Sequence, residues 1–210
     1  MRFEQLVAAV VHDLKNQLQA LLDYEQEALA RIPKRYHNHL LPILQRTTRL
    51  KNDTMQMMSL FSMEQKQAFP MDDAWPFDTV TDAIEATSQQ FPALQFDNRI
   101  DENCQGFYNE NLVQLALVTL ITNSAQAGAS EVIISADDNN GLTLTVEDNG
   151  HGFDPRVLAG EKNTTKNGGT GLGLYFVQLI AERHGNDQQR GRVDYGNRPQ
   201  GGAFVSIYLP

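Results

Sequence analysis

Two glycine-rich clusters joined by a polar loop, between Glu147 and Leu174, carry the clearest chemical signal in the chain. The first, at 148–152, reads Asp-Asn-Gly-His-Gly; the second, at 168–174, reads Gly-Gly-Thr-Gly-Leu-Gly-Leu and opens a helical pattern. Free amides and the positive end of a helix dipole converge on such a cluster, where phosphate groups bind. A carboxylate at a strand end can accept hydrogen bonds from an exocyclic amine such as that of adenine. The spacing predicts a nucleotide pocket with a movable lid over 154–167.

Each cluster alone has a simpler interpretation. Asp-Asn-Gly is ordinary turn chemistry, and a single glycine-rich run is more often a flexible connector. The second cluster is not a Walker loop, because no Gly-Lys-Ser/Thr follows, and it does not follow a first strand as a dinucleotide fingerprint would. The combination of two clusters across a loop of lid length favours the nucleotide interpretation.

A third piece of chemistry lies upstream, at Asn123. This residue falls near the apolar stripe of a predicted helix over 110–127, where an unpartnered amide would cost free energy. One interpretation is a core asparagine satisfied by a cap or a water molecule. The other is an oxygen ligand for Mg²⁺ bound to phosphates.

Together, Asn123, the 148–152 cluster and the 168–174 run resemble the N, G1 and G2 boxes of the ATP-binding superfamily that contains DNA gyrase, heat-shock chaperones, mismatch-repair ATPases and histidine kinases. The resemblance covers about 77–210 and implies a Bergerat-type α/β sandwich that binds ATP and Mg²⁺. It implies Asp148 as the adenine contact and Asn123 as the magnesium ligand. The remaining cofactor-binding residues that it implies are Gly150, Gly152, Lys166, Gly169, Thr170, Gly171, Leu172 and Gly173.

The N-terminal run Val-His-Asp-Leu-Lys-Asn-Gln-Leu, at 11–18, resembles the H box of histidine kinases and favours that branch. His12 offers an imidazole nucleophile, and Asp13 can accept its other ring proton. Asn16 lies one turn further along the same face, where its amide could position a water against phosphohistidine. A lone helical histidine is usually structural or exposed, but this one accompanies an acid, an amide and a complete ATP site. We interpret the other histidines, His37, His39, His151 and His184, as surface or loop residues.

Some positions depart from the patterns of the superfamily. The hydrolytic branches carry a glutamate four residues before the asparagine, where this chain has Thr119, so hydrolysis by an activated water is disfavoured. Many histidine kinases carry a basic residue at the position of Gln126, which leaves Lys162 or Lys166 to approach the γ-phosphate. The proline after the H box and a phenylalanine-rich F box are missing, and 161–166 resembles the lid of the nitrogen-regulator class.

Apolar residues at helical spacing predict two long helices, from 3 to about 30 and from about 38 to 63, with Pro33 between them. Such a hairpin leaves most of its apolar stripe wet, so we expect two copies to form a dimeric four-helix bundle. The irregular stretch 68–76 is predicted to link this hairpin domain, 1–67, to an ATP-binding domain, 77–210.

The second domain is predicted to be an α+β sandwich with an antiparallel or mixed sheet and helices on one face. Asp78 is predicted to cap a helix that runs to about 91, and Asn109 a helix over 110–127; a third helix is predicted from 173 to about 184. Strands are predicted at 94–100, 131–136, 142–146, 192–195 and 203–209, the second and third forming a hairpin.

Composition limits the classes of partner. A chain of 210 residues with 41% hydrophobic content can bury a core, and a net charge of −9 disfavours a broad surface for nucleic acid. The apolar run 6–11 is far shorter than the roughly 20 residues of a membrane span, and no signal peptide is evident. The single cysteine, Cys104, cannot form an internal disulfide, which predicts a reducing, cytoplasmic compartment.

We therefore expect a soluble protein-histidine kinase that transfers the γ-phosphoryl group of Mg-ATP to His12 and then to an aspartate of a response-regulator receiver domain, with phosphatase activity toward that partner. The alternatives are a histidine phosphotransfer or scaffold protein with a vestigial nucleotide domain, and an ATPase of the gyrase or chaperone type. Because the first helix begins near Met1, we expect either a separate sensor protein that regulates the homodimer or an excised core.

Overall fold

The computed structural model describes residues 3–37, 39–44, 46–48, 50–51, 53–54, 70–88, 90–159, 172–185 and 188–210, with the side chains of 3–12, Lys15 and Leu172 excepted. The chain divides into two compact units, Met1–Lys66 and Gln67–Pro210. Each unit is described separately below.

The first unit is a helical hairpin, as predicted. Its first helix, α1, runs from Phe3 to Arg31 without glycine or proline, and it ends just before Pro33, which lacks the amide hydrogen that a continuing helix needs. A 3-10 turn, Lys34–Tyr36, follows. Every described residue between 37 and 54 is helical, and the remainder of the predicted second helix lies outside the described residues.

Contacts between the two helices show that they run antiparallel. The Thr47 hydroxyl donates to Glu25 Oε1 at 2.8 Å, and Lys51 Nζ donates to Gln19 Oε1 at 2.5 Å. Residues further along the second helix therefore contact residues nearer the start of α1. Leu18 and Leu22 are buried in the hairpin, whereas the large apolar side chains of Leu14, Leu21, Tyr24, Leu41, Ile43 and Leu50 remain exposed in the single chain.

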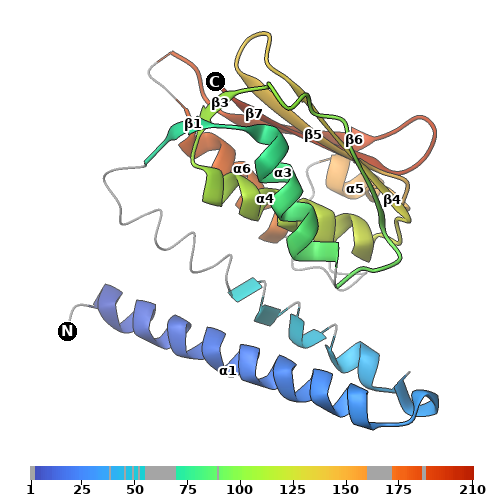
Figure 1. Ribbon diagram of the computed structural model, residues 1–210. Coiled ribbons are helices and arrows are strands. Elements are labelled where there is room, and N and C mark those ends of the chain that lie inside the picture. Colours follow the sequence, from blue (N-terminus) through green and yellow to red (C-terminus); the bar gives the residue numbers. More distant parts are fainter. Residues whose placement is uncertain are drawn as a thin grey trace. The chain divides into compact units, whose positions relative to one another are not determined.

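The second unit is built on a five-stranded mixed sheet, which confirms the predicted fold class (Figure 1). Its strand order is β2-β4-β5-β7-β6, with bounds Gln95–Asn98, Glu131–Asp137, Leu142–Asp148, Ala203–Leu209 and Arg192–Asn197 respectively. Only β2 and β4 pair in parallel within this sheet; the other pairs are antiparallel. The predicted hairpin is β4–β5.

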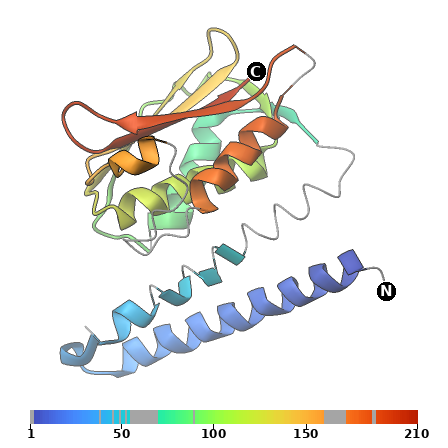
Figure 2. The same cartoon turned by 180° about the vertical axis from the view of Figure 1, so that it is seen from behind.

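Three helices cover one face of this sheet: α3 (Pro76–Ser88), α4 (Glu110–Gln126) and α6 (Leu172–Arg183) (Figures 1 and 2). Asn109 caps α4 as predicted, because its side chain accepts a hydrogen bond from Leu112 N at 3.0 Å. Alternating burial along β5 directs its apolar residues toward the helices. The fully buried side chains include Leu117, Ile121, Ile134, Leu144, Phe176, Ile180 and Ile207.

Some local predictions were wrong or incomplete. The helix α3 begins at Pro76, so Asp78 lies within its first turn and is not its cap; proline is favoured at the first helical position, where its missing amide hydrogen costs nothing. Within the stretch 68–76, Asp72–Ala74 form strand β1, which pairs with β3 (Gly106–Tyr108) in a separate two-stranded sheet. A short helix, α5 (Pro155–Leu158), follows the first glycine cluster.

Candidate active site

Asp148, the predicted adenine contact, is the last residue of β5 and only 6% exposed. Its Oδ1 accepts hydrogen bonds from Gly150 N at 2.8 Å and Ala203 N at 3.2 Å. Its Oδ2 accepts one from the Ser124 hydroxyl at 2.9 Å. Because a carboxylate offers about four lone-pair directions, Oδ2 can still accept a donor from a ligand. The carboxylate is therefore both fixed by the protein and able to bind an amine.

The glycines of the first cluster are required by contacts within the protein. A Cβ atom at Gly150 would lie 2.7 Å from Ala127 O at the end of α4, where His151 N also donates to Ala127 O at 3.1 Å. Gly152 has φ +74°, a conformation that side chains other than glycine rarely adopt. These contacts hold the loop close to α4, and the predicted role of Gly150 and Gly152 in cofactor binding stays a prediction.

Asn123 lies on α4 with its side chain exposed, so the alternative of a core asparagine was wrong. The buried face of α4 passes through Val113, Leu117, Leu120 and Ser124, which directs position 123 away from the core. A Cβ atom at Gly173 would lie 3.1 Å from Asn123 Nδ2 and 3.2 Å from Thr119 Cγ2. The asparagine amide thus meets the first turn of α6, where the second glycine cluster ends.

The donor set at Asn123 fits a magnesium ion held mainly by a nucleotide. Mg²⁺ bound to phosphates takes one or two protein oxygens and completes its shell with water and phosphate. Among the described residues no group of three or more histidine, cysteine, aspartate or glutamate side chains could hold a metal ion. Thr119 is 5% exposed and its hydroxyl donates to Leu115 O at 2.8 Å, so this position supplies no carboxylate base.

Several predicted site residues lie outside the described residues. These are Lys162, Lys166, Gly169, Thr170 and Gly171; Leu172 opens α6, but its side chain is not described. In the hairpin, the backbone of His12 belongs to α1, its side chain is not described, and Asp13 and Asn16 are exposed. His12, the predicted phosphoacceptor, thus lies on a helix, and its phosphorylation stays a prediction.

His184 was predicted to be a surface or loop residue; it lies in the turn after α6, but it is not at the surface. This side chain is 2% exposed, its Nδ1 hydrogen-bonds Ile180 O at 2.7 Å, and its Nε2 accepts from Asn109 N at 3.0 Å. An Nε2 that accepts a hydrogen bond carries no proton, so the proton resides on Nδ1. Burial lowers the pKa of His184, an effect that the hydrogen bond to Ile180 O partly offsets. His39 and His151 are exposed, as predicted.

Residues that the sequence did not single out also contact the site. Ser124 holds Asp148, and it occupies a position on the apolar face of α4, a signal that sequence reasoning could have used. Asn149 Oδ1 accepts hydrogen bonds from Ser130 N at 2.9 Å and Glu131 N at 3.1 Å, which ties the first cluster to the start of β4. Asn197 and Arg198 contact the cluster from the far end of the chain, and nothing local predicts this contact.

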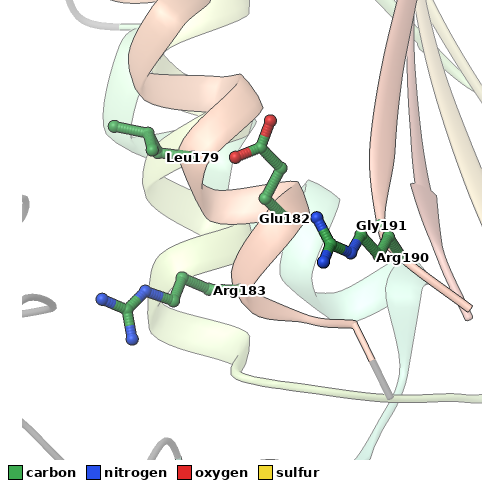
Figure 3. A pocket seen from close by; sticks show the side chains of 5 residues that line it. All are labelled: Leu179, Glu182, Arg183, Arg190 and Gly191. Atoms are coloured by element: carbon green, nitrogen blue, oxygen red, sulfur yellow. The ribbon is translucent and has the colours of Figure 1, made fainter. Parts of the chain in front are cut away.

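A surface depression lies elsewhere, at the C-terminal end of α6 (Figure 3). It is lined by Leu179, Glu182, Arg183, Arg190 and Gly191, and Arg183 points away from Arg190. It includes none of the predicted nucleotide-binding residues. Among the described residues, no helix has the length and apolar character needed to cross a membrane.

The sequence and the fold of this chain are similar to those of known proteins. Residues 108–210 match the family described as histidine kinase-, DNA gyrase B- and HSP90-like ATPase. The tetrathionate sensor histidine kinase TtrS of Salmonella typhimurium is 28% identical over 98% of this chain, and the sensor protein QseC of Escherichia coli O157:H7 is 30% identical over 99%. The chain spans 37% and 47% of the lengths of these relatives. The solved ATP-binding domain of PrrB from Mycobacterium tuberculosis, 24% identical, matches 67% of this chain and 96% of its own with a TM-score of 0.55.

Proposed function

We propose that the chain, whose residues 108–210 match the family described as histidine kinase-, DNA gyrase B- and HSP90-like ATPase, is a histidine kinase catalytic core that phosphorylates its own His12 with Mg-ATP. The observation that supports this proposal best is the buried Asp148 carboxylate at the end of β5. A second supporting observation is that the Asn123 amide lies close to Gly173, which brings the N box next to the end of the second glycine cluster.

Asp148, Asn123 and the first turn of α6 each have a task in the proposed reaction. Asp148 Oδ2 accepts the exocyclic amine of adenine while Ser124 and two backbone amides hold it. Asn123 would hold Mg²⁺ through its amide oxygen, and the bound ion would neutralise phosphate charge. The N-terminal end of α6, at Leu172 and Gly173, directs a positive helix dipole at the phosphates. Positioning and charge neutralisation carry most of the catalysis in phosphoryl transfer.

We infer that the acceptor is His12; Thr119, which offers no carboxylate to activate water, supports transfer to a side chain over hydrolysis. A ring nitrogen of His12 attacks the γ-phosphorus, the bond to the β–γ bridging oxygen breaks, and ADP leaves while the imidazole loses its other proton. Asp13 accepts that proton, and Asn16 positions a water molecule whose attack on phosphohistidine would compete with the next transfer. The phosphoryl group then passes to an aspartate of a response-regulator receiver domain.

The exposed leucines of the hairpin support the homodimer. Leu14, Leu21 and Leu50 are each more than 40% exposed in the single chain, which is costly for side chains at helical spacing on a long hairpin. Two copies would bury them in a four-helix bundle. Phosphatase activity toward the response regulator and control by a separate sensor protein complete the proposal.

Incubation of the full chain with γ-labelled ATP and Mg²⁺ tests the proposed transfer. We expect an acid-labile, alkali-stable label on the parent chain and on His39→Gln, a matched variant on an exposed helical histidine. His12→Gln should carry no label and still bind ADP. Label that persists in His12→Gln would move the acceptor elsewhere, and a parent that binds no ADP would support a phosphotransfer or scaffold protein with a vestigial nucleotide domain. Steady phosphate release without phosphoprotein would support an ATPase.

A further inference from the structure

The turn between β6 and β7 contacts the first glycine cluster, although about 50 residues separate the two in sequence. Gly201 N donates to Arg198 O at 3.1 Å, which closes a four-residue turn with Pro199 in its second position. Proline at this position fixes the backbone angle that the turn needs, and Gly201 adopts φ +97°. The turn is therefore a stiff support for the side chains at its base.

Arg198 is the charged residue of this turn, and its side chain is only 12% exposed. Its Nη1 donates to the backbone oxygen of Asp148 at 2.9 Å. Its Nε lies 3.1 Å from Glu147 Oε1, an ion pair whose geometry falls short of a hydrogen bond. A guanidinium that is desolvated to this extent costs free energy unless it is hydrogen-bonded or paired with an opposite charge, so the hydrogen bond to Asp148 O and the ion pair with Glu147 offset part of that cost.

The contact occurs where regular strand pairing ends. On the β7 side of β5, the ladder stops at the pair Glu147–Phe204, one residue before Asp148. The next amide of β7, Ala203 N, donates to the Asp148 carboxylate. Arg198 in turn binds the Asp148 backbone oxygen. The turn thus contacts the main chain of the aspartate, and the first residue of β7 contacts its side chain.

The other end of the cluster is held by Asn197. Its Oδ1 accepts from Phe153 N at 2.6 Å, and its Nδ2 donates to Phe153 O at 3.1 Å. The rings of Phe153 and Tyr195 lie 5.3 Å apart between centroids, which adds an aromatic contact from β6. A Cβ atom at Gly202 would lie 1.9 Å from Asp148 O, so the turn approaches as closely as glycine allows.

We propose that Arg198, supported by Asn197, is a positioning residue that aims Asp148 at the nucleotide base and thereby sets the preference for adenine. This inference rests on the proposed function, since it requires Asp148 to bind the exocyclic amine. A site built to bind an amine rejects a base that lacks it, because buried polar groups are then left unpaired. That rejection depends on how accurately the carboxylate is aimed.

Binding of ADP and IDP to the full chain tests the proposal, because IDP carries an oxygen where ADP carries the amine. Isothermal titration, with competition against a fluorescent nucleotide for weak binding, gives both dissociation constants. We expect the parent to prefer ADP, and Arg198→Met to reduce the ADP-over-IDP ratio about tenfold, the value of one hydrogen bond to a charged group. IDP affinity should change by less than about twofold, because IDP lacks the amine whose contact with Asp148 the variant disturbs.

Two variants act as matched controls. Arg192 lies on the same hairpin, and its side chain is 62% exposed and paired with Asp194. Arg192→Met should therefore keep the ADP-over-IDP ratio of the parent. Glu147→Gln removes the charge of the ion-pair partner but leaves the contact of Arg198 with Asp148 O, so it should change the ratio less than Arg198→Met does. Arg198→Lys, which keeps the charge but not the planar fork, replaces Arg198→Met if the latter does not fold.

The outcomes separate this inference from the proposed function. If the parent binds ADP with no preference over IDP, the adenine contact of Asp148 is wrong and the proposed function loses its main support. If the parent prefers ADP but Arg198→Met weakens ADP and IDP equally, the turn only stabilises the fold and the inference is refuted. In the Asp148→Asn background, Arg198→Met should have no further effect on the ratio; an additional tenfold loss there would show that Arg198 acts by another route.

Discussion

The two ends of the candidate nucleotide site are built in different ways. At the base end, three donors from α4, the glycine loop and β7 hold a buried carboxylate, Asp148. At the phosphate end, Asn123 is exposed and meets the first turn of α6 at Gly173. The base end is therefore organised by the protein alone, whereas the phosphate end offers groups that a nucleotide and its metal ion would complete.

Neighbouring residues of α4 serve these two ends. Successive residues of a helix point about 100° apart, so Ser124 faces Asp148 while Asn123 faces α6. A displacement of α4 would disturb both ends at once. Single substitutions, in contrast, can affect one end and leave the other intact, and they are the means to test whether the difference is real.

The largest effect is expected from removal of the carboxylate at the base end. Asp148→Ala leaves Ser124 Oγ, Gly150 N and Ala203 N without their acceptor, and it should lower the free energy of unfolding by roughly 3 kcal/mol. Asn123→Ala, at the exposed end, should change it by less than about 0.5 kcal/mol. Urea denaturation of both variants measures this difference. Equal destabilisation would mean that both ends are organised by the protein.

A smaller effect is expected at the phosphate end from Gly173→Ala. The added methyl would lie 3.1 Å from Asn123 Nδ2 and displace the amide, so the dissociation constant for ADP with Mg²⁺ should rise about tenfold. The free energy of unfolding should stay level or rise by up to about 1 kcal/mol, because alanine favours helix over glycine. Titrations with Mg²⁺ and with chelator provide the control. The same loss of affinity in both would contradict a metal-linked role for Asn123.

Much of the fold is predictable because its signals are local. Asn109 caps α4, Pro33 follows the end of α1, and the Asp-Asp-Asn-Asn-Gly run forms the β4–β5 connection, each within a few residues of the element that it defines. The position of Asp148 at the end of a strand is local in the same sense, since the strand pattern ends there. These features follow from hydrogen bonding and backbone preference at single positions.

Features that depend on distant contacts were missed for a physical reason. A helical stripe locates a buried face only to within about one residue, so the sequence left open whether Asn123 is a core residue or a magnesium ligand; the structure exposes Asn123 and buries Ser124. His184 continues the buried spacing of Phe176 and Ile180, so it could have been recognised as buried. No signal near Arg198 predicts its contact with Asp148, because strand pairing alone brings them together.

The smallest expected effect concerns His184, which holds the N-terminal end of the helix that serves both ends of the site. Its Nε2 accepts from Asn109 N, and burial lowers its pKa, so protonation is easier in the unfolded chain, where the pKa is about 6.5. The unfolded state then binds more protons, and the stabilising contribution of neutral His184, complete above pH 6.5, is lost as pH falls through the lowered pKa. His184→Gln, whose amide oxygen can accept from Asn109 N without titrating, should lack this loss. Urea denaturation of both proteins at pH 8 and at pH 5.5 gives the comparison, with pH 8 as the internal reference. A parent that loses no more stability than the variant between these pH values would show that the base of α4 does not depend on a neutral His184.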